Sequence, residues 1–375
     1  MFLIERAISL SCFLLALLSN CYLISHIKEN QYKFILVAYL FLLCVFAWFF
    51  VPHTTSDLYR LKEYMETWIY YDWSDLLDYA STRADLSWVI FSYIASLLGN
   101  NNWLQTLSCF IGTSFLFYII GNLISKLKLE RGQRGWLLFY AVSTGGIFIS
   151  LISGIRSPLG TVILCYCVYD EMLNKGSFIK HLPLYLFAAT LHSFVLFLVM
   201  LRISFLWLGR DSLFVKIFSF ISMLVILGMF FSYGDFYLQA GMDKSSGYVN
   251  NAEEYTYIWS GLTSAIINFM AFILIRYGYQ LSNRETNQTV KPYLLFTLFC
   301  NIGAILALPF SFAIFSRMSF FVFYLAMPIY AFLLTGSASN DKLNDRIRRI
   351  NTILILLCLI SFTRGSICGY KFFIL

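Results

Sequence analysis

The sequence has few charged residues for its length and no motif of a soluble enzyme. Only 13% of its 375 residues are Asp, Glu, Lys or Arg, whereas 59% are hydrophobic. A soluble domain has about a quarter of its residues charged, so this composition excludes an ordinary soluble protein. No Walker loop and no GxGxxG, GxSxG or HExxH segment is present. The chain therefore has no obvious means of using ATP, and no cofactor is predicted.

Paired cysteines are also missing. The nine cysteines all lie in apolar stretches, without a CxxC motif or a Cys/His cluster. This pattern predicts buried structural thiols, with neither a disulfide framework nor a metal site indicated. The net charge of +7 comes mostly from short loops between apolar segments. Such loops set membrane orientation, so the charge does not indicate nucleic-acid binding.

What the sequence does have is a series of uncharged runs, each about 20 residues long, which is enough to cross a bilayer. They predict an all-α polytopic integral membrane protein, with residues 1–375 forming one domain. The first run lacks a signal-peptide cleavage pattern and is predicted to be a retained span. Residues 86–98 are short for a span and suit an interfacial helix, a re-entrant helix or a short span. In total we expect about 11–12 transmembrane or re-entrant helices, the others near residues 7–25, 34–51, 103–125, 135–153, 155–172, 182–201, 212–233, 259–277, 292–315, 317–336 and 350–369.

Loop charges predict the orientation of these helices. Basic clusters, expected in the cytoplasm, occur at residues 126–134, 276–291 and 342–349. The acidic loops 52–85 and 234–258 are expected outside. Simple alternation of the spans puts 234–258 inside, so one break is needed between Arg156 and Asp235. A broken or re-entrant helix around His192 would supply it, because irregular backbone is allowed where it lines a cavity within the protein.

The two acidic loops are also rich in aromatic residues. The first loop contains Tyr59, Tyr64, Trp68, Tyr70, Tyr71, Trp73 and Tyr79, and the second contains Phe236, Tyr237, Tyr248, Tyr255, Tyr257 and Trp259. Aromatic faces stack on sugar rings and carboxylates bind hydroxyl groups, so this mixture suits a carbohydrate ligand. The aromatic belt at a membrane interface has the same composition. Both interpretations are open at this stage.

Three polar residues interrupt long apolar runs. Arg156 lies between two uncharged segments, His192 interrupts residues 182–201, and Arg317 interrupts residues 292–336. An ionisable residue inside a membrane indicates a functional site. The alternatives are an arginine that reaches the interface or caps carbonyl groups and a core histidine bonded to a backbone carbonyl.

These residues suggest a site for an anionic substrate. Arg156 and Arg317 are each expected to begin a helix, where two guanidinium groups can hold a pyrophosphate together with free N–H groups. His192 can accept a proton or orient a hydroxyl group. Asp57 and Arg60, three residues apart, are candidates for substrate binding, although a local ion pair explains them equally well.

Four segments, in this order, resemble a known family. Residues 51–60 (VPHTTSDLYR), Gly154-Ile155-Arg156 followed by a helix, residues 188–193 (AATLHS) and residues 317–321 (RMSFF) with Pro328 beyond them are similar to the EpsG/Wzy group of bacterial O-antigen and exopolysaccharide polymerases. The resemblance covers about residues 50 to 335. Val51-Pro52 departs from the group, in which an arginine often precedes the Asp-Tyr pattern.

The resemblance implies a GT-C-like multi-span glycosyltransferase of the bacterial inner membrane with its active site facing the periplasm. Such an enzyme transfers a growing glycan from undecaprenyl pyrophosphate to an undecaprenyl-pyrophosphate-linked repeat unit. Arg156 and Arg317 would then bind the pyrophosphate, His192 would orient or deprotonate the acceptor hydroxyl, and Asp57 and Arg60 would line the sugar or donor side.

Three other functions stay open. One is a non-catalytic assembly scaffold, for which single changes at Arg156 or Arg317 would leave glycan length unchanged. An O-antigen ligase shares the donor, and a lipid-linked oligosaccharide flippase or other transporter shares the hydropathy, although a transporter typically shows an internal repeat and none is evident here. The resemblance also implies pathway partners, namely a flippase and a chain-length regulator, in addition to membrane lipid.

Overall fold

The computed structural model is built from helices, as the sequence predicts. It describes residues 2–52, 57–68, 70–81, 85–143, 148, 150–208, 213, 215–222, 224, 254–284, 290–309, 311–337 and 341–367. Helices account for most of this part of the chain, which contains no β-strand. The predicted all-α class is confirmed.

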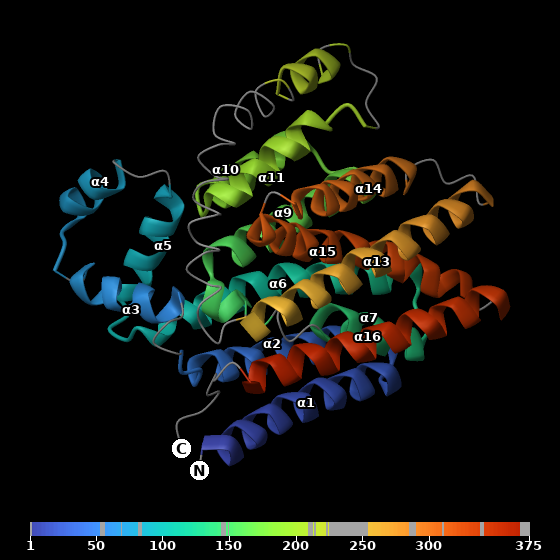
Figure 1. The fold of residues 1–375 in the computed structure, drawn as a ribbon, viewed down its shortest axis with the longest axis horizontal. Coiled ribbons are helices and arrows are strands. Elements are labelled where there is room, and N and C mark those ends of the chain that lie inside the picture. Colours follow the sequence, from blue (N-terminus) through green and yellow to red (C-terminus); the bar gives the residue numbers. More distant parts are fainter. Residues whose placement is uncertain are drawn as a thin grey trace.

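Long apolar helices form the body of the molecule. Within the described residues, four are long and apolar enough to cross a membrane: α6 (Asn102–Leu127), α13 (Glu254–Arg284), α14 (Val290–Ala307) and α15 (Phe312–Ser337). Figure 1 shows them beside α1 (Phe2–His26), α2 (Tyr32–Trp48), α7 (Arg131–Ser143), α9 (Arg156–Leu173) and α16 (Asp341–Ile367). The protein is thus a multi-pass membrane protein.

The basic clusters gather at one end of these helices, which we call the basic end. Here the Gln133 amide donates to the Leu334 carbonyl at 2.7 Å. The Arg346 guanidinium donates to Gln280 at 3.3 Å, and the Lys126 ammonium to the Leu173 carbonyl at 2.6 Å. The Arg346–Gln280 contact joins two of the three segments that the sequence assigns to one side of the membrane. The other two contacts tie the third segment, residues 126–134, to the ends of α15 and α9.

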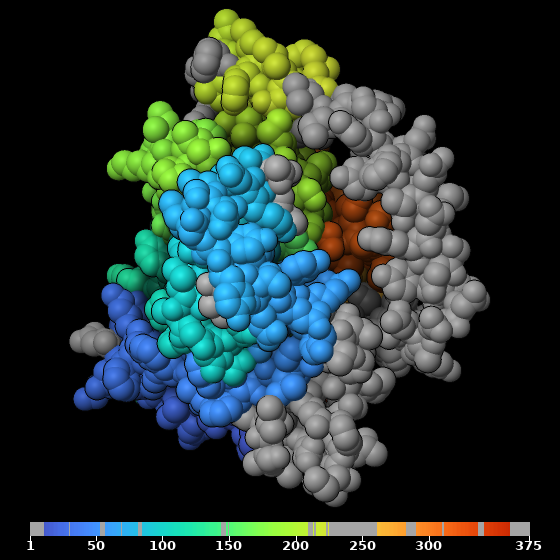
Figure 2. All heavy atoms as spheres, turned by 90° about the vertical axis from the view of Figure 1, so that its left-hand side faces the viewer, coloured from blue at the N-terminus to red at the C-terminus, as the bar shows by residue number. Residues whose placement is uncertain are grey.

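At the opposite end, which we call the pocket end, lie three short helices: α3 (Asp57–Trp68), α4 (Trp73–Ser81) and α5 (Leu86–Ser96). They form the left-hand part of Figure 1, and in Figure 2 they face the viewer in blue to cyan, with part of α15 in dark orange beside them. The predicted loop 52–85 is therefore largely helical. In α3 the buried side chains are three or four residues apart, namely Leu58, Leu61, Met65 and Trp68, so one face of an amphipathic helix packs inward.

Residues 178–204 form a helical hairpin that enters and leaves at the basic end. Helices α10 (Phe178–Ala189) and α11 (Ser193–Ser204) have 12 residues each. At 1.5 Å per residue each arm is about 18 Å long, which is short for a bilayer core of about 30 Å. Thr190, Leu191 and His192 make the turn between the arms.

Contacts with α9 fix the direction of both arms. At the base of the hairpin, Arg202 of α11 lies 2.9 Å from Glu171, and His181 of α10 lies 3.2 Å from Asp170. At the tip, a Cβ atom on Gly160 would lie 3.2 Å from the Ala188 carbonyl and 2.9 Å from Val195. Both arms therefore run along the same stretch of α9, and glycine at position 160 is what permits their close approach.

This hairpin is the break that the loop charges require. Helix α13 begins at the pocket end, close to Phe312, the first residue of α15. A Cβ atom built on Gly261 would lie 3.2 Å from the Phe312 ring. Loop 52–85 and the start of α13 thus share one end, and the expectation of a broken or re-entrant helix around His192 is confirmed. Most of the loop 234–258 lies outside the described residues.

Two predicted boundaries are wrong. Helix α15 begins at Phe312, so Arg317 is in its second turn and does not begin a helix. Pro309 follows the end of α14, and the Ile314 N–H donates to the Ser311 hydroxyl, a local signal for a helix start. The segment predicted as one helix, 135–153, is α-helical only to Ser143 and ends as a π-helix, η2 (Ser150–Gly154).

The hairpin predicts that residues before and after it lie on the same side of the membrane. We expect a cysteine at Lys175 and one at Trp207, both exposed, to react with a membrane-impermeant maleimide from one side only, the same side for both. A cysteine at Tyr70, which is 86% exposed at the pocket end, should react from the other side. Labelling of intact cells and inverted vesicles measures this, with the unsubstituted protein as the background. Reaction of positions 175 and 207 from opposite sides would contradict the hairpin.

Candidate functional site

Arg156 begins α9 at the pocket end, directly after a strained turn. Ile155 has φ = 28°, an unusual value for a β-branched residue. The turn is held in place because Ile155 is buried and the Ser108 hydroxyl donates to the Leu151 carbonyl of the π-helix at 2.7 Å. Strain of this kind persists only where the surroundings impose it and is common at functional sites.

The Arg156 guanidinium contacts two groups of the short helices. It lies 3.2 Å from the Asp85 carboxylate and 5.6 Å from the centre of the Trp88 ring. Its side chain is 28% exposed, and that of Asp85 is 16% exposed. Arg156 is therefore held by an ion pair and a cation–π contact but keeps an accessible edge. Its partners are a carboxylate and an aromatic ring, not the backbone carbonyl of the capping alternative.

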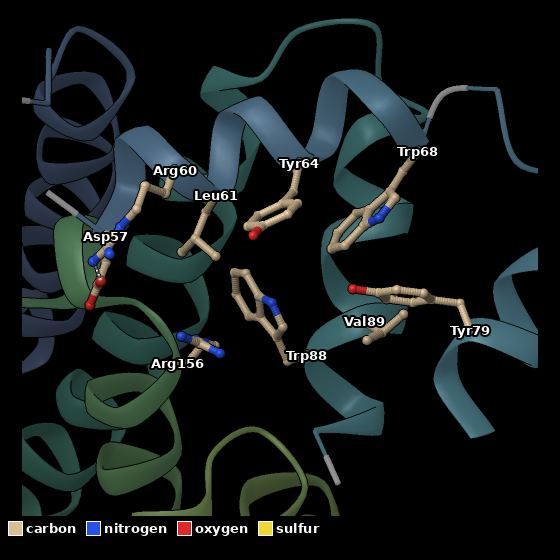
Figure 3. Close-up of a pocket in the computed structure, with 9 residues that line it drawn as sticks. All are labelled: Asp57, Arg60, Leu61, Tyr64, Trp68, Tyr79, Trp88, Val89 and Arg156. Carbon is tan, nitrogen blue, oxygen red and sulfur yellow. Dashed lines mark hydrogen bonds and ion pairs between the residues drawn. The ribbon is translucent and has the colours of Figure 1, made fainter. Parts of the chain in front are cut away.

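This edge faces a cavity of about 260 Å³ between α3, α4, α5 and α9. Figure 3 shows the rings of Tyr64, Trp68, Tyr79 and Trp88 turned toward one another, with Arg156 and the Asp57–Arg60 pair at one side. Ligand pockets for drug-sized molecules begin at about 300 Å³, so the cavity fits a smaller group such as one sugar ring. Aromatic faces with charged groups at one side are suited to such a ring.

The walls of the cavity are set by local hydrogen bonds. The Asp57 and Arg60 side chains form the ion pair that their spacing predicts, and both are exposed. Helix α4 begins where Asp72 accepts the Asp75 N–H at 2.8 Å and the Ser74 hydroxyl at 2.7 Å. These bonds lower the pKa of the Asp72 carboxyl. The Tyr93 hydroxyl donates to the Tyr71 carbonyl and ties α5 to the chain between α3 and α4.

His192 caps the second arm of the hairpin. Its Nδ1 accepts the Phe194 N–H at 3.0 Å. A nitrogen that accepts a hydrogen bond carries no proton, so the ring is neutral and its proton is on Nε2. Next to it, the Thr190 and Ser87 hydroxyl oxygens are 2.6 Å apart and join the hairpin tip to α5. His192 thus presents an N–H donor at the pocket end.

Arg317 reaches the same region from α15. Its guanidinium lies 5.9 Å from the centre of the Phe194 ring, beside the histidine cap. Among the residues that the structure describes, Arg317 has no hydrogen-bond or ion-pair partner, and its side chain is exposed. Arg156 repels it and Asp57 attracts it. A cation near a second cation, without a carboxylate of its own, is an arrangement that an anionic ligand would complete.

The five residues singled out in the sequence are therefore brought to one end of the molecule. The charges of Arg317, Arg156, Asp57 and Asp85 all act on the His192 ring, and Arg60 is paired with Asp57. They come from four places in the chain, namely α3, α9, the hairpin tip and α15. Apart from the paired Asp57 and Arg60, they offer two guanidinium groups and an imidazole N–H next to an aromatic cavity.

Sequence reasoning missed Asp85 and Trp88. Asp85 is the last residue of the acidic loop 52–85, and nothing in its neighbourhood connects it with Arg156, 71 positions later. Trp88 lies in the short apolar segment whose role was open. The side chains of the second aromatic loop lie outside the described part of the structure. The expected role of this loop in a sugar site therefore stays a prediction.

Comparisons with known proteins give one match. A family model described as the EpsG family matches residues 32–368, nearly the whole chain. No curated protein and no solved structure matches.

The Ser87–Thr190 contact predicts that α5 and the hairpin tip can be joined covalently. Hydroxyl oxygens 2.6 Å apart place the two Cβ atoms near the separation of about 3.5–4.5 Å that a disulfide needs. We expect Ser87→Cys/Thr190→Cys to form an internal disulfide under mild oxidation, detected by mass spectrometry of the linked peptides. Ser87→Cys/Ser177→Cys is the matched control, because Ser177 lies at the base of the same hairpin. No bond in the first pair, or equal yields in both, would contradict the assembled site.

Proposed function

Because the chain belongs to the EpsG family, we propose that it is an O-antigen polymerase of the bacterial inner membrane. In this proposal it transfers a growing glycan from undecaprenyl pyrophosphate to the sugar end of an undecaprenyl-pyrophosphate-linked repeat unit. Family membership supports a polysaccharide polymerase in general terms. The donor, the acceptor and the side of the membrane are parts of the proposal.

The observation that carries the proposal is the pair of arginines at the pocket end. Among the described residues, Asp85 is the only ion-pair partner of Arg156. Arg317 has no ion-pair partner among them. With one of the two guanidinium groups paired to a carboxylate, positive charge is left for a ligand. A pyrophosphate suits them because arginine binds phosphate oxygens through two parallel N–H bonds.

The proposed reaction is a displacement at the anomeric carbon of the donor glycan. An acceptor hydroxyl oxygen forms a bond to that carbon, while the bond between the carbon and the pyrophosphate oxygen breaks. The electron pair of the broken bond goes to undecaprenyl pyrophosphate, and the hydroxyl proton is released to a phosphate oxygen or to water. Arg156 and Arg317 stabilise the negative charge that develops on the leaving group.

His192 acts in this scheme as a hydrogen-bond donor. Its Nδ1 is occupied by the Phe194 N–H, so the group that faces a ligand is Nε2–H. A general base would need a free lone pair on Nε2, and this would require moving the proton to Nδ1 and losing the helix cap. We therefore assign His192 to orienting a phosphate or hydroxyl oxygen, the first of the two roles that the family resemblance implies.

The aromatic cavity is assigned to a sugar of one of the two lipid-linked glycans. Tyr64, Trp68, Tyr79 and Trp88 supply ring faces, and the exposed Asp57–Arg60 pair supplies hydrogen-bonding groups. The collection of basic residues at the other end supports a periplasmic position for this cavity, because basic loops stay in the cytoplasm.

Loss of either arginine is expected to abolish polymerisation while the protein stays inserted and abundant. In a strain deleted for this gene, wild-type protein should restore the ladder on a lipopolysaccharide gel. Arg156→Ala and Arg317→Ala should leave a single repeat unit on the core, and Arg→Lys at either position should impair the ladder, since lysine lacks the planar fork. Arg348→Ala, an exposed cation at the basic end, is the control and should behave as wild type.

Other patterns on the same gel would replace the proposal. Bare core with lipid-linked polymer in the deletion strain would mean a ligase. Bare core with single units held on the cytoplasmic leaflet would mean a flippase. A full ladder from either alanine variant would remove the pyrophosphate assignment.

Two substitutions of His192 separate donation from proton abstraction. Gln places an N–H₂ donor near the position of Nε2 but cannot abstract a proton, and Asn keeps an N-cap acceptor but is too short to replace Nε2–H. We expect His192→Gln to retain more polymerase activity than His192→Asn, with similar protein levels on an immunoblot. Equal and complete loss in both variants, with wild-type activity that falls at low pH as the imidazole protonates, would show a general base instead.

A further inference from the structure

A second cavity of about 220 Å³ lies near the pocket end, on the other side of α3 from the candidate site. Its walls are the end of α2 and residues 49–52, with Lys62 of α3 and Asn102 of α6. On a helix with 3.6 residues per turn, Lys62 points about 160° away from Arg60 and Tyr64, which line the candidate site. Helix α3 thus separates two cavities of different character.

Lys62 is the one charged group among the described residues that line this second cavity. Its ammonium donates to the Asn102 side-chain oxygen at 2.7 Å, and in the described part of the chain it has no carboxylate partner. Burial lowers the pKa of Lys62 to about 8, because the apolar surroundings disfavour the charged form. An ammonium group has three N–H donors, so donors are left over for an anion that would stabilise the charge.

The cavity continues into an apolar surface on α2. Phe34, Val37, Phe41, Val45 and Phe49 are each between 49% and 73% exposed. Their spacing of three or four residues puts them on one face of the helix. This face runs from the basic end to Trp48 and Phe49 in the cavity wall. A long hydrocarbon chain on this face would therefore end beside Lys62.

We propose that this cavity binds the head of an anionic membrane lipid, with the lipid phosphate on Lys62 and a hydrocarbon chain along the exposed face of α2. Charge complementarity selects the head, since the described lining of the cavity contains a cation and no carboxylate. The apolar lining and the continuous face select a lipid over a free anion. The site does not depend on the proposed transferase chemistry.

Native mass spectrometry of the purified full-length protein tests the proposal, with phosphatidylglycerol and phosphatidylcholine as probes at equal concentration. We expect wild type to bind phosphatidylglycerol in preference. Lys62→Met should reduce this preference about ten-fold, the effect of losing one charge-assisted hydrogen bond. Lys62→Arg should retain it. Lys33→Met, an exposed lysine at the other end of α2, is the matched control and should leave the preference unchanged.

Three results would overturn the proposal. One is equal binding of the two lipids by wild type, and another is an unchanged preference in Lys62→Met. The third is displacement of phosphatidylglycerol by inorganic phosphate at millimolar concentration, which would show a site for a free anion. If Lys62→Met is not monodisperse, Lys62→Gln replaces it. This test measures lipid binding and not polymerisation. A failed lipid proposal would therefore leave the polymer ladder unaffected, and a missing ladder would leave the lipid preference unaffected.

Discussion

The buried ion pair between Glu171 and Arg202 is the contact on which the arrangement of the site depends. Their side chains are 0% and 2% exposed, so both charges are withdrawn from water. Removing one partner of such a pair costs about 3–5 kcal/mol, because it leaves the other charge buried alone. Helix α11 therefore cannot slide along α9 or continue across the membrane without burying an unpaired arginine. The pair fixes the hairpin on α9 and puts His192 at the far end of it.

The position of the hairpin determines which parts of the chain share an end. Helices α10 and α11 return to the basic end, α13 starts at the pocket end, and α15 runs in the same direction as α9. Arg156 and Arg317 thus face the same region although 160 residues lie between them. The π-helix and the strained Ile155 then turn the chain so that Arg156 opens α9 beside Asp85.

The sequence predicts the membrane class, the break around His192 and the cluster of five residues because each rests on charge. An arginine or histidine in an apolar run is costly, and loop charges restrict how often the chain crosses the membrane. It does not predict α3 and α4, whose short amphipathic patterns are hidden among acidic and aromatic residues. It also misses the Asp85–Arg156 and Lys62–Asn102 contacts, since each joins residues 40 or more positions apart. The turn at Ile155 depends on packing against α6 and has no local signal.

The charges at the pocket end are suited to a leaving group that becomes more negative. Asp85 offsets one of the two arginines, and Asp57 offsets Arg60, so among the described residues the site has about one unpaired positive charge, that of Arg317. In the proposed reaction the pyrophosphate gains a further negative charge as its bond to the sugar breaks. Interactions that strengthen as charge develops lower the barrier, whereas equal binding of substrate and transition state does not. Arg156 is held by Asp85 and Trp88 and is therefore pre-oriented, whereas Arg317 is free to follow the departing oxygen. The two arginines thus have different roles. Arg156 sets the geometry of the site, and Arg317 completes it.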